Sequence, residues 1–152
     1  MNRRTIFALC AACLSVFTPV SSTAGDFPKG SPDFERSYAA ALKKAKESGK
    51  PLVVVFSATW CPPCQSNKKN VYPSEPVKVF HDKFIWAYLD TDDETSAKTA
   101  KEFGVSGIPH IQFVDKDGKS IDKMVGGSSP EEFAKTLTGI LAKIKGATSA
   151  GK

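Results

Sequence analysis

The sequence predicts a single α/β domain with one central mixed β-sheet and helices on both of its faces. Three observations support this prediction. Apolar runs typical of buried strands alternate with helical patterns along much of the chain, which favours parallel strands joined by helices. An Asp117-Gly118 turn then joins two further strand-like runs, as expected for an antiparallel hairpin. Finally, 152 residues with 41% hydrophobic content have room for one compact domain and its core.

The first two predicted elements are an amphipathic helix and a buried strand. Ser31 is expected to be the N-cap and Pro32 the first residue of the helix, which should end at Gly49. Its apolar residues recur at helical spacing and are Phe34, Tyr38, Leu42 and Ala45. Residues 51–57 (PLVVVFS) form a continuous apolar run, which is typical of a strand covered on both faces.

The middle of the chain is predicted to contain two longer helices, a short turn or helix, and another buried strand. Tyr72-Pro73 should end the first of these helices, and Gly104 should be the C-cap of the second. The four elements are expected, in chain order, at residues 61–71, 74–81, 84–89 and 94–103. The inner face of the last one should consist of Ala97, Ala100 and Phe103.

The C-terminal part is predicted to be a β-hairpin followed by one helix. The hairpin strands are expected at residues 110–114 and 120–125. The last helix should begin at Ser129-Pro130, because serine is a common N-cap and proline a common first helical residue. The resulting domain is expected to span residues 31–145, before a flexible tail at residues 146–152.

The beginning of the chain has the pattern of a cleavable signal peptide. A basic start (MNRR) precedes an apolar stretch over residues 5–20 and then small residues, so cleavage is expected after Ala24. The alternative is a membrane anchor, but about 15 apolar residues are short for a bilayer span. Residues 1–24 are therefore interpreted as a signal peptide, followed by a connector at residues 25–30. Export would place a soluble, monomeric protein in the periplasm of a Gram-negative bacterium.

Composition and charge argue against several other classes of protein. The hydrophobic content is too high for global disorder, and no later stretch reaches the roughly 18 apolar residues of a membrane span. Loss of two arginines with the signal peptide would lower the net charge from +5 to +3. Because this excess is small and contains no basic block, binding to nucleic acid is not indicated.

The cysteines provide the main functional signal. Of the four, only Cys61 and Cys64 would remain after export. A disulfide across so short a loop adds little stability, so chemistry explains the pair better. At the start of a helix, free N–H groups and the helix dipole lower the pKa of the Cys61 thiol, so that Cys61 attacks and Cys64 resolves the mixed disulfide. Pro62 and Pro63 remove two N–H donors, which indicates a reductant or an exchanger of intermediate potential.

Two other interpretations of the cysteine pair are weaker. Half of a zinc site would need further ligands, and only His81 and His110 remain as nitrogen donors, 17 and 46 positions beyond Cys64. An inert structural disulfide would gain little from closing such a short loop. We therefore expect no metal site, and the sequence indicates no small-molecule cofactor.

Two segments resemble the signatures of the thioredoxin superfamily. Residues 56–64 (FSATWCPPC) are similar to its active-site segment, and residues 103–109 (FGVSGIP) are similar to its second signature. The likeness covers nearly the whole domain and implies a thioredoxin fold. It also implies that Pro109 forms a cis peptide bond and faces the cysteines, with Trp60 as an apolar platform beside them. The Ile108 backbone would then be free to pair with an extended substrate.

The sequence departs from this family beneath the cysteines. Many thioredoxins have a buried acid and a neighbouring lysine where this chain has Val55 and Tyr88. Val55 cannot accept the proton of the resolving thiol, and a tyrosine hydroxyl with its usual pKa near 10 is a poor base. His110 follows Pro109, and two interpretations are open. It would either lie near the sulfurs and raise the redox potential, or face a neighbouring side chain or solvent.

The cysteine chemistry and the resemblance together predict an exported thiol–disulfide oxidoreductase that exchanges the Cys61–Cys64 pair with protein thiols and disulfides. A reductant in an oxidising compartment would need an electron donor, such as a membrane dithiol protein. Three alternatives remain open. The pair could donate disulfides, or it could be a dedicated reductant of apocytochrome c thiols. The protein could also be a non-catalytic binding module that uses the surface around Trp60 and Pro109.

Overall fold

The computed structural model describes residues 27–150, and its centre is a five-stranded β-sheet in the order β1-β3-β2-β4-β5. The strand bounds are β1 Phe34–Glu35, β2 Leu52–Ser57, β3 Ile85–Asp90, β4 His110–Val114 and β5 Ser120–Val125. Strand β2 pairs in parallel with β3 and antiparallel with β4, so the predicted mixed sheet is confirmed. The predicted signal peptide lies outside the described residues, as does the first part of the predicted connector.

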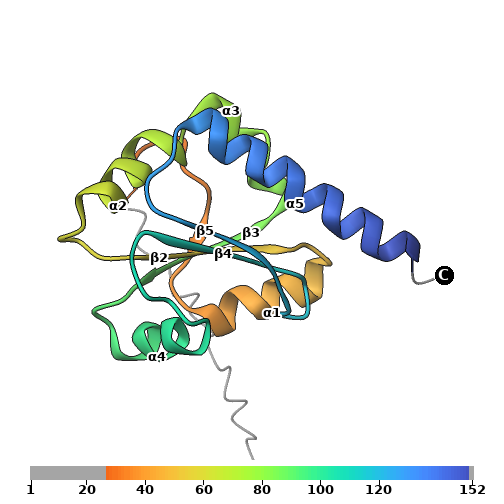
Figure 1. Ribbon diagram of the computed structural model, residues 1–152, viewed down its shortest axis with the longest axis horizontal. Helices are drawn as coiled ribbons and strands as arrows, with labels where there is room; N and C mark the ends of the chain where they lie inside the picture. Colours follow the sequence, from red (N-terminus) through yellow and green to blue (C-terminus); the bar gives the residue numbers. More distant parts are fainter. Residues whose placement is uncertain (1–26, 151–152) are drawn as a thin grey trace, which may run out of the picture.

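Within residues 27–150, five α-helices accompany the sheet. Their bounds are α1 Tyr38–Ser48, α2 Pro62–Ser66, α3 Glu75–Lys78, α4 Glu94–Glu102 and α5 Pro130–Ala150. Helices α1 and α4 lie on one face of the sheet, and α2, α3 and α5 lie on the other (Figure 1). Both faces are therefore covered, as predicted. In this part of the chain no helix combines the length and apolar character needed to cross a bilayer.

Strand β2 forms the centre of the domain, because all of its residues are buried. Its side chains alternate between two cores. Val53 and Val55 belong to the core between the sheet and α5, whereas Val54 and Phe56 belong to the core against α1 and α4. A continuous apolar run is what such a doubly covered strand requires, since neither of its faces contacts water.

The N-terminal part of the domain differs from the prediction. Helix α1 begins at Tyr38 with Ser37 as its N-cap, and not at Pro32. Phe34 lies in β1 instead, where it is paired with Trp86 and packs edge-on against the indole at a centroid distance of 5.9 Å. The prediction was wrong because a serine-proline pair is only a local helix signal. Pairing with β3 partly buries Phe34 against other aromatic rings, and this outweighs the local signal.

The helical segment after the cysteines is less regular than predicted. In place of one helix to Val71, α2 ends at Ser66 and the chain continues as a π-helix over Asn67–Val71. The wider turn places both Asn67 and Val71 in the interior. The short helix expected next is present as α3, and a 3₁₀ turn follows over His81–Lys83.

The predicted inner face of helix α4 is confirmed in part, since Ala100 is buried and Phe103 packs against the same core. Ala97 is exposed, and the buried residues are Ser96, Thr99 and Ala100. Burial of Thr99 is acceptable because its hydroxyl donates a hydrogen bond to the Thr95 carbonyl at 3.1 Å. The prediction was wrong only for Ala97, because a single alanine is too small to determine which side of a helix faces the core.

Helix α5 is longer than predicted. It continues to Ala150, whereas the sequence placed its end at residue 145 and a tail from residue 146. Residues 146–150 include two alanines, and alanine favours helical structure. The helix consequently projects beyond the edge of the sheet (Figure 1).

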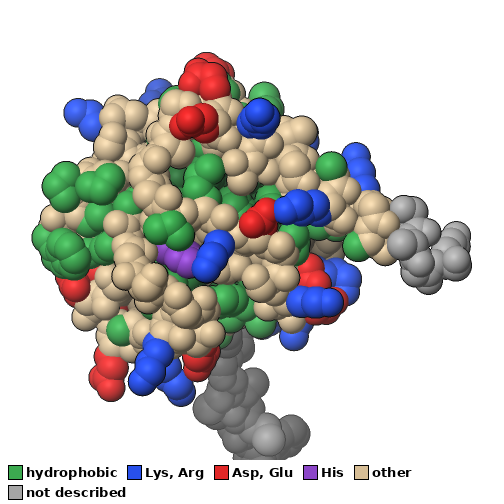
Figure 2. Space-filling view, in the orientation of Figure 1, with side chains coloured by type: hydrophobic (Ala, Val, Ile, Leu, Met, Phe, Trp, Pro, Cys, Tyr) green, Lys and Arg blue, Asp and Glu red, His purple; other side chains and the backbone are tan. Residues whose placement is uncertain are grey.

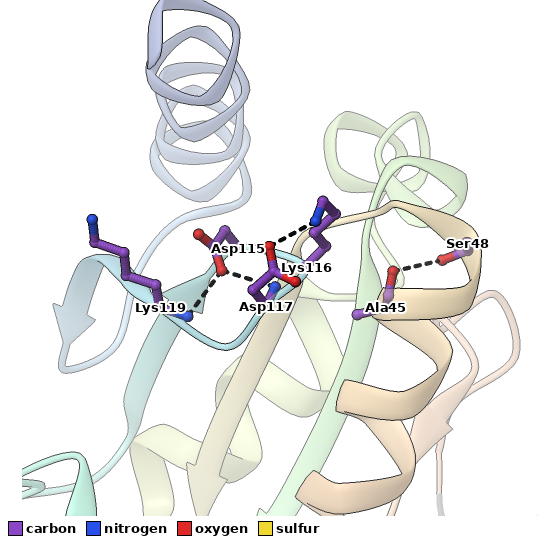
Figure 3. A network of polar contacts seen from close by, with 6 residues as sticks. All are labelled: Ala45, Ser48, Asp115, Lys116, Asp117 and Lys119. Atoms are coloured by element: carbon purple, nitrogen blue, oxygen red, sulfur yellow. Dashed lines mark hydrogen bonds and ion pairs between the residues drawn. The ribbon is translucent and has the colours of Figure 1, made fainter. Parts of the chain in front are cut away.

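Asp115 organises the tight turn between β4 and β5 (Figure 3). Its carboxylate accepts the backbone N–H groups of Asp117 and Lys119, each at 2.9 Å. Gly118 lies between them in the left-handed region, with φ of 88°. A Cβ atom at this position would lie 3.1 Å from the Tyr38 hydroxyl. Glycine is thus required both by the backbone conformation and by the close approach of α1.

We expect Gly118→Ala to lower the free energy of unfolding by about 1–2 kcal/mol, because it introduces backbone strain and a close contact. Gly139→Ala in α5 is the matched control, since a Cβ there would have no neighbour within 4 Å. The control should raise the free energy of unfolding by about 0.5–1 kcal/mol through helix propensity. Urea unfolding measures both, and equal effects would contradict this interpretation of the turn.

Candidate active site

Cys61 and Cys64 lie where β2 leads into α2. Cys61 is the N-cap of the helix, and the two prolines occupy its first two positions. Proline is favoured there, because its missing N–H would have no partner within the helix. The two sulfurs form a disulfide, and the Cα atoms are 5.3 Å apart, within the ordinary range for such a bond. The predicted location of the pair in the first helical turn is confirmed.

The surroundings of Cys61 offer few hydrogen-bond donors. Both cysteines are buried in the disulfide form, with 3% of Cys61 and 1% of Cys64 exposed. Pro62 and Pro63 have no N–H, and the Gln65 N–H donates to the Cys61 carbonyl at 3.1 Å. A thiolate at Cys61 therefore gains less from this helix start than it would from one without prolines.

The loop before β4 closes the site from another side. The Ile108–Pro109 peptide bond is cis, as the resemblance implies. Ile108 packs against Ala58 and the two cysteines. At the far end of β5, the Gly126 N–H donates to the Pro109 carbonyl at 2.8 Å. The fold thus brings together the two sequence signatures, which are far apart along the chain.

Trp60 lies next to the cysteine pair with 66% of its surface exposed. Its indole N–H donates to the Asp92 carboxylate at 2.9 Å, a role that the sequence did not indicate for Asp92. Together with Gly107 and Ile108, the ring lines a depression of about 520 Å³ that extends to α4. Hydrophobic side chains gather at the end of the molecule where the β2–α2 loop lies (Figure 2). The exposed ring provides an apolar surface that a polypeptide could contact.

Asn67 is a site residue that the sequence pattern did not reveal. It lies one helical turn beyond Cys64, is only 1% exposed, and accepts the Ser128 N–H at 3.2 Å. Gly127 lies in the same loop, and a Cβ atom there would lie 3.6 Å from Cβ of Pro63. The loop after β5 therefore packs directly on the active-site helix. A single polar residue in a helix is too weak a signal to predict this contact.

His110 is buried, and its side chain contacts Gln112 and Phe56. One ring nitrogen lies 3.1 Å from the Gln112 side-chain oxygen, and the ring packs edge-on against Phe56 at 5.9 Å. Phe56 belongs to the core on the α1 and α4 face, whereas the segment after Cys64 packs on the opposite face. This agrees with the second interpretation, a strand histidine facing neighbouring side chains. Within residues 27–150, no three His, Cys, Asp or Glu side chains are grouped as metal ligands.

Beneath the cysteines, the place of the family's buried acid is apolar. Val55 is buried and lies directly opposite Tyr88 in the parallel register. The Tyr88 hydroxyl lies 2.5 Å from the Ser57 hydroxyl in the interior. Burial raises the pKa of Tyr88, and the hydrogen bond with Ser57 opposes this effect. The tyrosine is therefore protonated at neutral pH and serves as a hydrogen-bonding group, not as a base.

Comparison with known proteins agrees with this geometry. The family described as Thioredoxin-like domain matches residues 38–140. The thioredoxin-like protein HCF164 of Arabidopsis thaliana chloroplasts is 36% identical over 126 residues, which are 83% of this chain and 46% of HCF164. Thioredoxin H4 of A. thaliana is 37% identical over 102 residues, 66% of this chain and 80% of the relative. The thiol:disulfide interchange protein DsbD of Pseudoalteromonas atlantica is 29% identical over 136 residues, 84% of this chain and 23% of DsbD.

A solved structure shows the same architecture. The thioredoxin from Thermus thermophilus superposes with a TM-score of 0.65 at 27% identity, and the match covers 71% of this chain and 86% of that one. The predicted thioredoxin fold is thereby confirmed, although this chain spans less than half of HCF164 and of DsbD. With the matched domain covering most of the chain and a Cys-Pro-Pro-Cys pair at the start of α2, this protein belongs to the thioredoxin-like family of thiol–disulfide oxidoreductases.

Proposed function

We propose that the protein is an exported reductant, or an exchanger of intermediate potential, that acts on protein disulfides through Cys61 and Cys64. The observation that carries the proposal is the placement of Cys61 as N-cap of α2, next to an exposed tryptophan and the loop of Pro109. This arrangement combines a nucleophile with a surface on which a polypeptide can lie.

In the reducing direction, the Cys61 thiolate attacks one sulfur of a substrate disulfide. A bond between Cys61 and the substrate forms as the substrate disulfide breaks, and the released substrate thiolate takes a proton from water. The Cys64 thiolate then attacks the Cys61 sulfur, which forms the Cys61–Cys64 disulfide and releases the second substrate thiol. Two electrons pass from the protein to the substrate in each cycle.

Three neighbouring residues would hold the substrate during this exchange. Trp60 would contact its apolar side chains, since two thirds of the ring surface is open and the indole is oriented by Asp92. An extended substrate segment would pair with the backbone at Ile108, with Pro109 beside the sulfurs. Pro62 and Pro63 would tune the potential by limiting the number of amide donors near Cys61.

The same local chemistry supports the proposed direction of electron flow. A strong oxidant needs a reduced form with an unusually stable thiolate. Pro62 and Pro63 have no backbone N–H that could donate a hydrogen bond to that thiolate, and His110 packs against Phe56 and Gln112. These features favour a reductant. The sequence of residues 1–24 supports export, and the similarity to DsbD supports a membrane dithiol protein as the electron donor in the periplasm.

Redox equilibration with glutathione tests the direction. The purified protein is incubated at pH 7 in buffers of graded glutathione ratio, and the oxidised fraction is quantified by mass after alkylation. We expect a potential between about −270 and −180 mV, the range from thioredoxin to protein disulfide isomerase. A potential above about −150 mV would contradict the reductant and support a disulfide donor.

A further inference from the structure

The loop that follows β5 is hydrogen-bonded to two separate parts of the redox site. We call residues 126–128 of this loop the bridging loop. At its beginning, the Gly126 N–H donates to the Pro109 carbonyl at 2.8 Å. At its end, the Ser128 N–H donates to the Asn67 side-chain oxygen at 3.2 Å. The bridging loop therefore connects the segment beside the cysteines with the helical segment that carries them.

Asn67 is an unusual side chain for its place in the fold. It is 1% exposed, because it begins the π-helix whose wider turn directs it into the interior. Its amide nitrogen has no hydrogen-bond partner in the part of the chain that the structure describes. An unpaired buried amide nitrogen costs free energy, and a leucine of similar size would carry no such cost. The bond to the bridging loop explains an asparagine here better than core stability does.

We propose that Asn67 is a positioning residue for protein substrates, and that it holds the bridging loop at a fixed distance from the active-site helix. This rests on the proposed function, in which an extended polypeptide lies beside Cys61 and Pro109. The loop already approaches the helix closely, since a Cβ atom at Gly127 would lie 3.6 Å from Cβ of Pro63. Without the bond from Ser128, the loop can move away from the helix.

Movement of the bridging loop would reach the substrate surface through Pro109. Because the Pro109 carbonyl accepts the Gly126 N–H, the two segments move together. A substrate segment that pairs with the backbone at Ile108 depends on the position of this segment. The cysteines are less affected, since the contact of Asn67 with the Cys64 carbonyl uses the backbone N–H and survives a change of side chain.

The proposal therefore separates two kinds of disulfide. A protein disulfide must be oriented by contacts with the surface before Cys61 can attack it, and loss of those contacts weakens its binding. A small disulfide reaches the sulfur without pairing with the backbone, so its reaction reports only the reactivity of Cys61. Removing the Asn67 oxygen should slow the first reaction and leave the second unchanged.

Three variants test this separation. Asn67→Leu keeps the size of the side chain and removes the oxygen that accepts the Ser128 N–H. Asn67→Asp is the rescue variant, because a carboxyl oxygen can accept the same N–H in either protonation state. Asn70→Leu is the matched control, since Asn70 lies in the same π-helix but is exposed, and its side chain donates to the Ser66 hydroxyl. Urea unfolding is measured for each variant to establish that it is folded.

The experiment compares insulin with the small disulfide dithiodipyridine. Insulin reduction is measured over a range of insulin concentrations with dithiothreitol as electron donor. The pre-reduced proteins are then mixed with dithiodipyridine, and release of thiopyridone is followed by its absorbance. We expect Asn67→Leu to raise the KM for insulin about fivefold, the net effect of one lost hydrogen bond, with kcat and the dithiodipyridine rate unchanged. Asn67→Asp should restore the KM, and Asn70→Leu should match the unaltered protein in both reactions.

An unchanged KM in Asn67→Leu would overturn the positioning role and leave the proposed function intact. Equal losses toward insulin and dithiodipyridine would also overturn it, because they would show a general effect on the cysteines. If Asn67→Leu does not fold, Asn67→Ala takes its place, since it removes the same oxygen without adding bulk. Failure of the proposed function would look different: the unaltered protein would react with dithiodipyridine but reduce no insulin, and the positioning role would fail with it.

Discussion

We expect Cys61→Ser to abolish reduction of insulin disulfides, leaving only the rate of dithiothreitol alone. The physical reason is that a serine hydroxyl is not ionised at neutral pH and cannot form a disulfide, so no mixed intermediate arises. Cys64→Ala is expected to be equally inactive in turnover, but for a different reason. Its Cys61 can still attack, and the mixed disulfide then persists because the resolving thiol is missing.

The two variants are distinguished by trapping substrate. Cys64→Ala should accumulate disulfide-linked complexes that run as larger species in a non-reducing gel and disappear after reduction, whereas Cys61→Ala should not. The reverse pattern would show that the attacking and resolving roles are exchanged. Equal insulin reduction by the unaltered protein and both variants would instead support the binding-module alternative, since the cysteines would then have no chemical role.

Trp86→Ala should produce the largest loss of stability, about 3–5 kcal/mol of the free energy of unfolding. Trp86 is 2% exposed and lies on β3 in the core beneath α5. Its ring contacts Phe34 at 5.9 Å and Phe133 at 6.2 Å, and its indole N–H donates to the His81 carbonyl at 3.3 Å. The substitution leaves a cavity among rigid rings and an unpaired carbonyl, and neither can be relieved by small movements.

Urea unfolding monitored by circular dichroism measures the effect. Trp60→Ala is the matched control, because it removes the same side chain from a site where 66% of it is exposed. That control should change the free energy of unfolding by less than about 1 kcal/mol, while slowing insulin reduction. Similar losses of stability in the two variants would contradict the assignment of Trp86 to the core and Trp60 to the substrate surface.

Much of the fold could be predicted because its signals are local. The continuous apolar run of β2, the Asp117-Gly118 turn and the cysteine pair at a helix start each require only a few adjacent residues to be recognised. The predicted secondary structure was wrong where a local sequence signal competed with packing against a residue far away in the sequence. Ser31-Pro32 is a good helix start in isolation, but pairing with β3 takes Phe34 into the sheet.

The candidate site shows the same division. The sequence by itself determined the position of the cysteine pair, the family and the order of the apolar strand segments along the chain, since these depend on residue type and short spacing. Only the tertiary structure decided which polar groups contact one another around the site. Ser57 and Tyr88 are 31 positions apart, and Asn67 and Ser128 are 61 apart, so their contacts exist only once the chain is folded. Hydrogen bonds of this kind depend on atomic distance and direction, which no pattern of residue types along a chain contains.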